Sequence, residues 1–106
     1  MKAEELRIGN WVFNKAHERK QLNEIYTDCS IYDPIPLTEE WLLRFGFKCF
    51  DIDEIGTYKK GVFVLVPNAK THFTCTYSGR MLRFITCVHQ LQNLYFALTG
   101  QELTIL

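Results

Sequence analysis

Residues 88–100 read VHQLQNLYFALTG and carry the clearest structural pattern of the chain. Apolar side chains recur there at spacings of three and four, as in an amphipathic helix: Val88, Leu91, Leu94, Tyr95 and Leu98. Gly100 follows, as expected of a residue just beyond a helix C-terminus. The stretch therefore predicts a helix over residues 88–99 that packs on a folded core.

The preceding residues carry the pattern of strands. Residues 71–77, THFTCTY, alternate strictly between apolar and polar side chains. Ser78-Gly79 is a turn signal, so we expect a hairpin into a strand over residues 81–86. Residues 61–66 are the most apolar strand candidate. This part of the chain predicts an antiparallel sheet.

The first third of the chain predicts a further hairpin. Trp11-Val12-Phe13 has strand propensity and follows a turn signal. Residues 14–20 are polar and charged and predict the hairpin loop. A second strand is expected near residues 22–26, and residues 27–31 either extend it or begin another.

A short helix is expected in the middle of the chain. Pro34 and Pro36 interrupt regular structure before it. Thr38 is expected to cap the helix through its hydroxyl, and Gly46 to end it. Trp41 either packs in the core or marks a helix that binds a partner. A short strand and a turn should follow, over residues 47–56.

These elements predict an α+β fold of one domain, residues 1–106. It would hold a small antiparallel sheet, one short central helix and a C-terminal helix. Residues 6–26 also fit part of an SH3-like barrel.

The composition favours a folded intracellular protein. Hydrophobic residues make up 47% of the chain, which argues against disorder. Twelve Lys and Arg balance twelve Asp and Glu, so the net charge is zero. This balance argues against a long-range electric field that would attract nucleic acid. A net charge near zero also permits self-association. No apolar stretch is long enough to span a membrane, and the N-terminus lacks the apolar region of a signal peptide. A cytoplasmic location is expected.

The cysteines predict neither a metal site nor a cofactor site. They stand at positions 29, 49, 75 and 87, without the close pairs that zinc sites use. In a reducing compartment they would act as small apolar residues. A disulfide framework is the alternative.

Three candidate sites have a structural alternative. Cys87 and His89 are close enough in sequence for a nucleophile and its base, but a strand end followed by a helix start would separate them. Cys75 and His72 have an odd spacing, which places them on opposite faces of a strand. The acidic residues 51, 53 and 54 lack the closing glutamate of a calcium loop.

Two surfaces are candidates for partners. Four basic residues stand near the aromatic strand residues Phe73, Tyr77 and Phe84, as in faces that bind single-stranded nucleic acid by stacking: Lys59, Lys60, Arg80 and Arg83. In the last helix Phe96 lies off the main apolar stripe and, with Tyr95, widens the apolar arc. We expect Tyr95 and Phe96 to form an interface, most simply in a homodimer that uses this helix or an adjacent edge strand.

Three stretches also carry a resemblance: LRIGNWV at 6–12, PIPLTEEWLLRFGF at 34–47 and VHQLQNLYFALTGQELTI at 88–105. Together they are similar to an uncharacterised family of short proteins from gut Bacteroidetes, often associated with prophages or other mobile elements. The resemblance implies a bacterial cytosolic setting and a mobile-element origin. It implies no catalytic or binding residue.

The sequence thus predicts a non-enzymatic accessory or protein-interaction protein. The alternative is a small nucleic-acid-binding module that uses a basic, aromatic sheet face. An enzyme built around Cys87 or His89 is the third hypothesis.

Overall fold

The computed structural model describes residues 6–22, 32–52, 55–68 and 72–105. The chain divides into two compact units, each described here by itself. Unit 1 comprises Met1–Pro36 and Cys87–Leu103, and unit 2 comprises Leu37–Thr86 and Thr104–Leu106. The prediction of one domain over residues 1–106 stays a prediction.

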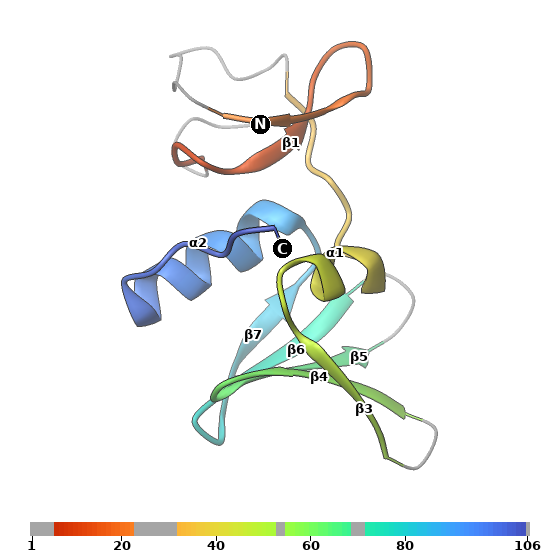
Figure 1. The fold of residues 1–106 in the computed structure, drawn as a ribbon, viewed down its shortest axis with the longest axis vertical. Helices are drawn as coiled ribbons and strands as arrows, with labels where there is room; N and C mark the ends of the chain where they lie inside the picture. The colour runs from red at the N-terminus through yellow and green to blue at the C-terminus, as the bar shows by residue number, and fades with distance from the viewer. Residues whose placement is uncertain (1–5, 23–31, 53–54, 69–71, 106) are drawn as a thin grey trace. The chain divides into compact units, whose positions relative to one another are not determined.

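The predicted α+β class with antiparallel sheets is confirmed (Figure 1). Unit 1 contains β1 (Trp11–Phe13), β2 (Arg19–Gln21) and α2 (Val88–Thr99). Unit 2 contains α1 (Glu39–Arg44), β3 (Lys48–Ile52), β4 (Ile55–Lys60), β5 (Phe63–Asn68), β6 (His72–Tyr77) and β7 (Arg80–Ile85). No closed barrel forms among the described strands, so the SH3-like alternative is not supported.

The hairpin of unit 1 is tighter than predicted. The side-chain oxygen of Asn14 accepts hydrogen bonds from the backbone N–H of Ala16 and Glu18, at 3.0 and 2.9 Å. These bonds make the loop shorter than the predicted one over residues 14–20. As a result, Arg19 and Lys20, which were predicted as loop, belong to β2 and pair with β1. All three β2 side chains are exposed, which explains why no alternation marked the strand. Of the strand predicted at 22–26, residues 23–26 lie outside the described part.

Helix α2 has the predicted bounds, Val88–Thr99. Gly100 follows with a left-handed φ of 74°, and its N–H donates to the carbonyl of Phe96. Cys87 occupies the N-cap position without a side-chain cap bond. The N–H of Val88 donates to the carbonyl of Ile35 at 2.9 Å, which fixes the start of the helix within unit 1.

One buried glutamine ties α2 to the β1 turn. Gln92 is fully buried, and its Oε1 accepts from the N–H of Trp11 at 2.8 Å. Its Nε2 donates to the carbonyl of Gly9 at 2.9 Å. A single amide therefore satisfies two backbone groups of the turn that would otherwise lack these bonds.

A second set of polar bonds lies beside it. Buried Asn10 donates through Nδ2 to Oδ1 of Asn93 at 2.9 Å, and its own Oδ1 accepts from the N–H of Arg7. The guanidinium of Arg7 also donates to Asn93 at 2.9 Å and pairs with Glu102. Unit 1 is thus held by a connected polar network as well as by its core of Leu6, Val12, Leu22 and Tyr32.

Unit 2 is a five-stranded antiparallel meander in the order β3-β4-β5-β6-β7 (Figure 1). Strand β4 was not predicted, because residues 55–60, IGTYKK, read as a turn followed by charge. Strand β5 runs two residues further than expected and includes Pro67. The turn between β6 and β7 has positive φ at both Ser78 and Gly79, 52° and 85°, as primed hairpin turns require.

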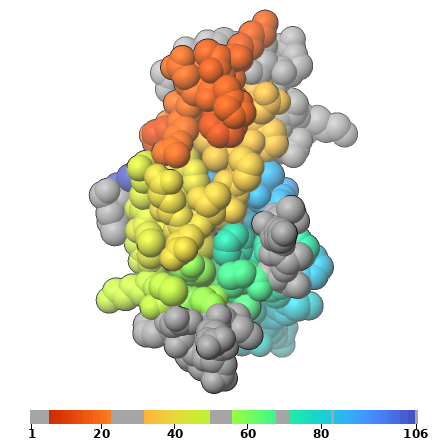
Figure 2. Space-filling model, turned by 90° about the vertical axis from the view of Figure 1, so that its right-hand side faces the viewer, coloured from red at the N-terminus to blue at the C-terminus, as the bar shows by residue number. Residues whose placement is uncertain are grey.

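Helix α1 packs into the core of unit 2. Trp41 is 2% exposed, so the core interpretation of this residue holds and the partner-binding one is wrong. Thr38 is the N-cap residue but makes no side-chain cap bond, and Gly46 follows with φ 90°. The space-filling view in Figure 2 shows α1, β3 and β4 (yellow to green) forming one packed surface with the strands that follow.

The polar tie at Gln92 gives a stability prediction. Gln92→Ala removes two buried hydrogen bonds, one from the N–H of Trp11 and one to the carbonyl of Gly9, so the free energy of unfolding should fall by about 2 kcal/mol. Urea unfolding measures the change. Exposed Gln101→Ala is the matched control and should stay within about 0.5 kcal/mol of the parent. Equal effects of the two changes would contradict this role.

The buried phenol of Tyr58 predicts a loss of stability at alkaline pH. Burial raises the pKa of Tyr58, and its hydrogen bond to the Glu39 side chain raises it further. Below about pH 10 the phenol is neutral in both states, whereas above it only the unfolded chain ionises. Stability should therefore fall by about 1.4 kcal/mol per pH unit from this group alone. Tyr58→Phe should remove that contribution, and parallel unfolding curves for the two proteins between pH 8 and 11 would refute it.

Candidate functional site

The pairing register sorts the side chains of unit 2 into two faces, because directly paired residues of antiparallel strands share a face. One face holds the row of Tyr58, Leu65 and Cys75, which are all buried. The next residue along each strand lies on the opposite face. We name this opposite side the outer face.

The outer face combines basic, hydroxyl and apolar side chains. One row across the sheet pairs Lys48, Lys59, Val64, Thr76 and Met81 in that order. A second row pairs Val66, Thr74 and Phe84. The two lysines are exposed, and so are Met81 at 69% and Phe84 at 53%. By the register, this face therefore holds two lysines and a large aromatic ring.

Phe84 has an aromatic neighbour on this face. The His72 ring meets the Phe84 ring edge-on, with centroids 4.9 Å apart and an interplanar angle of 64°. His72 comes from β6 and is only half-buried. The contact braces the Phe84 ring and leaves much of it open to solvent.

The charge of strands β4 to β7 is one-sided, which the balanced total of the whole chain conceals. No Asp or Glu occurs between residues 55 and 101. The same stretch holds five basic residues: Lys59, Lys60, Lys70, Arg80 and Arg83. This uneven distribution of charge along the sequence indicates a basic sheet, although the net charge of the whole chain is zero.

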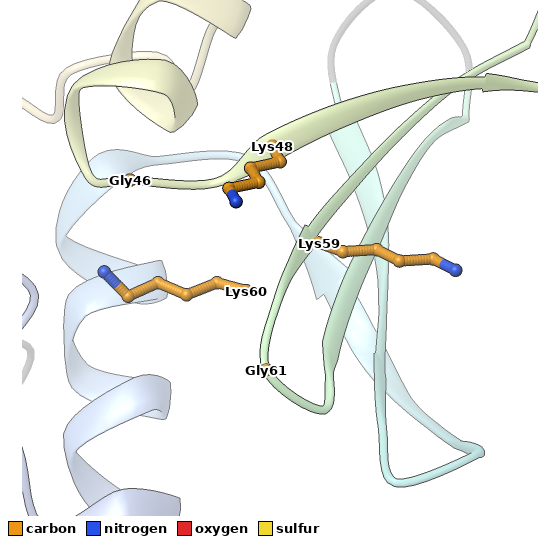
Figure 3. A pocket seen from close by; sticks show the side chains of 5 residues that line it. All are labelled: Gly46, Lys48, Lys59, Lys60 and Gly61. Atoms are coloured by element: carbon orange, nitrogen blue, oxygen red, sulfur yellow. The ribbon is translucent and has the colours of Figure 1, made fainter.

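A pocket of about 330 Å³ opens at the end of β3 and the β4–β5 hairpin. It is lined by Gly46, Lys48, Lys59, Lys60 and Gly61. Figure 3 shows the side chains of Lys48 and Lys60 extending toward the Gly46 side, while Lys59 extends the other way. The Lys60 ammonium donates to the carbonyl of Phe45 at 2.6 Å. Because the ammonium groups diverge, they suit an extended anion better than a compact one.

The structure divides the predicted nucleic-acid contacts. Lys59 lies on the outer face, whereas its neighbour Lys60 faces the opposite way and anchors the loop at Phe45. Arg80 is exposed at the β6–β7 turn. Arg83 pairs with Cys75 in the register, and its side chain lies outside the described part.

The aromatic residues divide in the same way. Phe73 is buried, and Tyr77 contacts the buried ring of Phe63, so both belong to the inner face. Of the aromatic residues proposed as a stacking surface, Phe84 is the exposed one.

Strand β7 is an edge of the sheet, and it is unusually apolar for one. Cys75 pairs with Arg83 and Thr76 with Met81, so Leu82 is an extra residue in a β-bulge. Leu82 is 40% exposed, next to exposed Met81 and near exposed Phe84. Bulges limit the pairing of edge strands with other chains, so side chains rather than backbone groups are the contact surface here.

The predicted interface on α2 is partly covered within unit 1. Phe96 is 39% exposed, and the guanidinium of Arg7 lies 4.3 Å from its ring centroid. Tyr95 is half-buried. A homodimer through Tyr95 and Phe96 stays a prediction.

The structure shows where the cysteine and histidine residues of the two candidate pairs lie. Cys75 is buried, and His72 lies on the opposite face of β6. Cys87 is the half-buried N-cap residue of α2, and His89 follows in the first turn. His89 is 2% exposed and therefore buried.

Metal-binding groups, disulfides and membrane-spanning helices can be assessed among the described residues. Of the acidic candidates, residues 53 and 54 lie outside that part. Within it, no group of three His, Cys, Asp or Glu side chains is arranged to hold a metal ion. Cys49, Cys75 and Cys87 form no disulfide with one another. Neither described helix has the length and hydrophobicity that crossing a membrane requires.

Comparison with protein-family models, curated proteins and solved structures found no match for this chain.

The cysteines give a prediction that tests the buried face. Cys49 is exposed on edge strand β3 and should react with a thiol reagent in the native protein at neutral pH. Cys75 is fully buried and should react only after unfolding. Peptide mass spectrometry after labelling separates the two sites. Rapid native labelling of Cys75 would show that the register described here is wrong.

Proposed function

We propose that this chain is a non-catalytic binding protein, and that its binding surface is the outer face with the adjoining β7 edge. The observation that carries the proposal is the cluster of exposed apolar side chains at Met81, Leu82 and Phe84. Large exposed apolar groups beside polar neighbours are typical of interaction sites. They lie on rigid strands, which hold a contact surface in place.

The placement of the reactive groups supports binding rather than catalysis. A nucleophile needs a base within hydrogen-bond reach. Cys75 and His72 lie on opposite faces of β6, so the strand itself separates them.

The biological setting rests on the resemblance alone. We propose a role as an accessory protein of a prophage or other mobile element in a Bacteroidetes cytoplasm. Self-association through Tyr95 and Phe96 of α2, which lies in unit 1, belongs to the same proposal.

A capture experiment tests the binding surface. The tagged chain is incubated with a Bacteroidetes lysate, and bound protein and bound nucleic acid are quantified separately, with and without nuclease. The double variant Met81→Ser with Phe84→Ser should lose the captured component by about tenfold, the size expected of a central contact.

Ile8→Ser is the matched control, because Ile8 is 61% exposed and belongs to unit 1. It should capture as much as the parent. Equal capture by the parent and the double variant, or no specific capture by either, would overturn the proposed function.

A further inference from the structure

We infer that the partner of the outer face is single-stranded nucleic acid. The inference rests on the proposed function, since it names the class of partner for the same surface. Three features carry it: the sign of the charge, the spacing of the ammonium groups and the exposed ring of Phe84.

The charge favours an anionic partner. Strands β4 to β7 lie within residues 55–85, where the sequence has basic residues but no carboxylate. The outer face adds Lys48 from β3, directly opposite Lys59. This pairing places two basic side chains in one row of the sheet.

The geometry of the lysines favours a long anion. Lys48 and Lys59 start from paired positions, yet their ammonium groups point in different directions (Figure 3). One phosphate ion would not reach both groups, whereas successive phosphates of a strand would. The pocket between the Gly46 loop and the Gly61 turn gives such a backbone room to approach.

The exposed ring of Phe84 can stack with a nucleic-acid base, a contact that binding to an acidic peptide would not require. Phe84 is held edge-on by His72, and half of its surface is open. Bases stack on such rings, and each stacked base contributes about 1–3 kcal/mol in proteins that bind single strands. Threonine hydroxyls at positions 74 and 76 lie on the same face between the ring and the lysines.

The same features distinguish single strands from duplexes. In a duplex the bases are stacked on one another, so an aromatic ring on a sheet has no free base face to contact. Helix α1 of the same unit packs into the core through Trp41 and Leu42, so it is not free to enter a major groove.

Fluorescence anisotropy with labelled oligo-dT and oligo-U of about 20 nucleotides tests the inference on the full chain. Binding should be detectable at low salt and should weaken as salt rises. Phe84→Ala should weaken binding about tenfold, in line with the loss of one stacked base. The Lys48→Ala with Lys59→Ala double variant should reduce the salt slope by about 1.4, as expected when two phosphate contacts on a single strand are lost.

Lys15→Ala is the matched control, because Lys15 is an exposed lysine in the hairpin loop of unit 1. It should bind like the parent, and circular dichroism should show that every variant is folded. Lys60 is left unchanged, because its bond to Phe45 also supports the fold.

Each other outcome overturns the inference. Tighter binding of a duplex of the same length would assign the face to double-stranded nucleic acid, and tighter binding of poly-glutamate would assign it to acidic protein. The absence of binding at low salt would exclude nucleic acid. In these cases the capture experiment still decides whether the outer face binds a partner, so the two proposals fail separately.

Discussion

The strand register of the β3–β7 meander is the constraint on which unit 2 depends. A slip of one residue in any pair would exchange its two faces. Leu65 and Cys75 would then be exposed, and Lys59 and Thr74 would enter the core. The present register buries the apolar rows and leaves Lys48, Lys59 and Phe84 on one open side. The proposed binding surface is therefore a consequence of the pairing that makes the fold.

A different interaction organises unit 1. Its hairpin is short and its second strand is fully exposed, so strand pairing alone would be marginal. Gln92 and Asn93 supply the missing bonds by holding the turn at residues 9–11 against α2.

The sequence predicted those elements in which pattern and packing agree. The α2 helix has a clear three-and-four spacing and a glycine stop, and the β6 strand alternates without error. Strands β2 and β4 were missed because Arg19–Gln21 and Ile55–Lys60 have too few alternating apolar residues.

The outer face could be predicted only in part. Lys59 and Phe84 were identified, but Lys48 joins them only through pairing between β3 and β4, which a single strand's pattern does not contain. Lys60 was included because neighbours in sequence were taken as neighbours on a surface, although successive strand residues face opposite ways.

The proposed partner surface is one face of one sheet. NMR mapping of backbone amide shifts during titration with oligo-dT tests this assignment. We expect the largest shifts on Lys48, Lys59, Thr74, Thr76 and Phe84, with little change over α2 in unit 1. Shifts that concentrate on α2, or that spread evenly over both units, would contradict it.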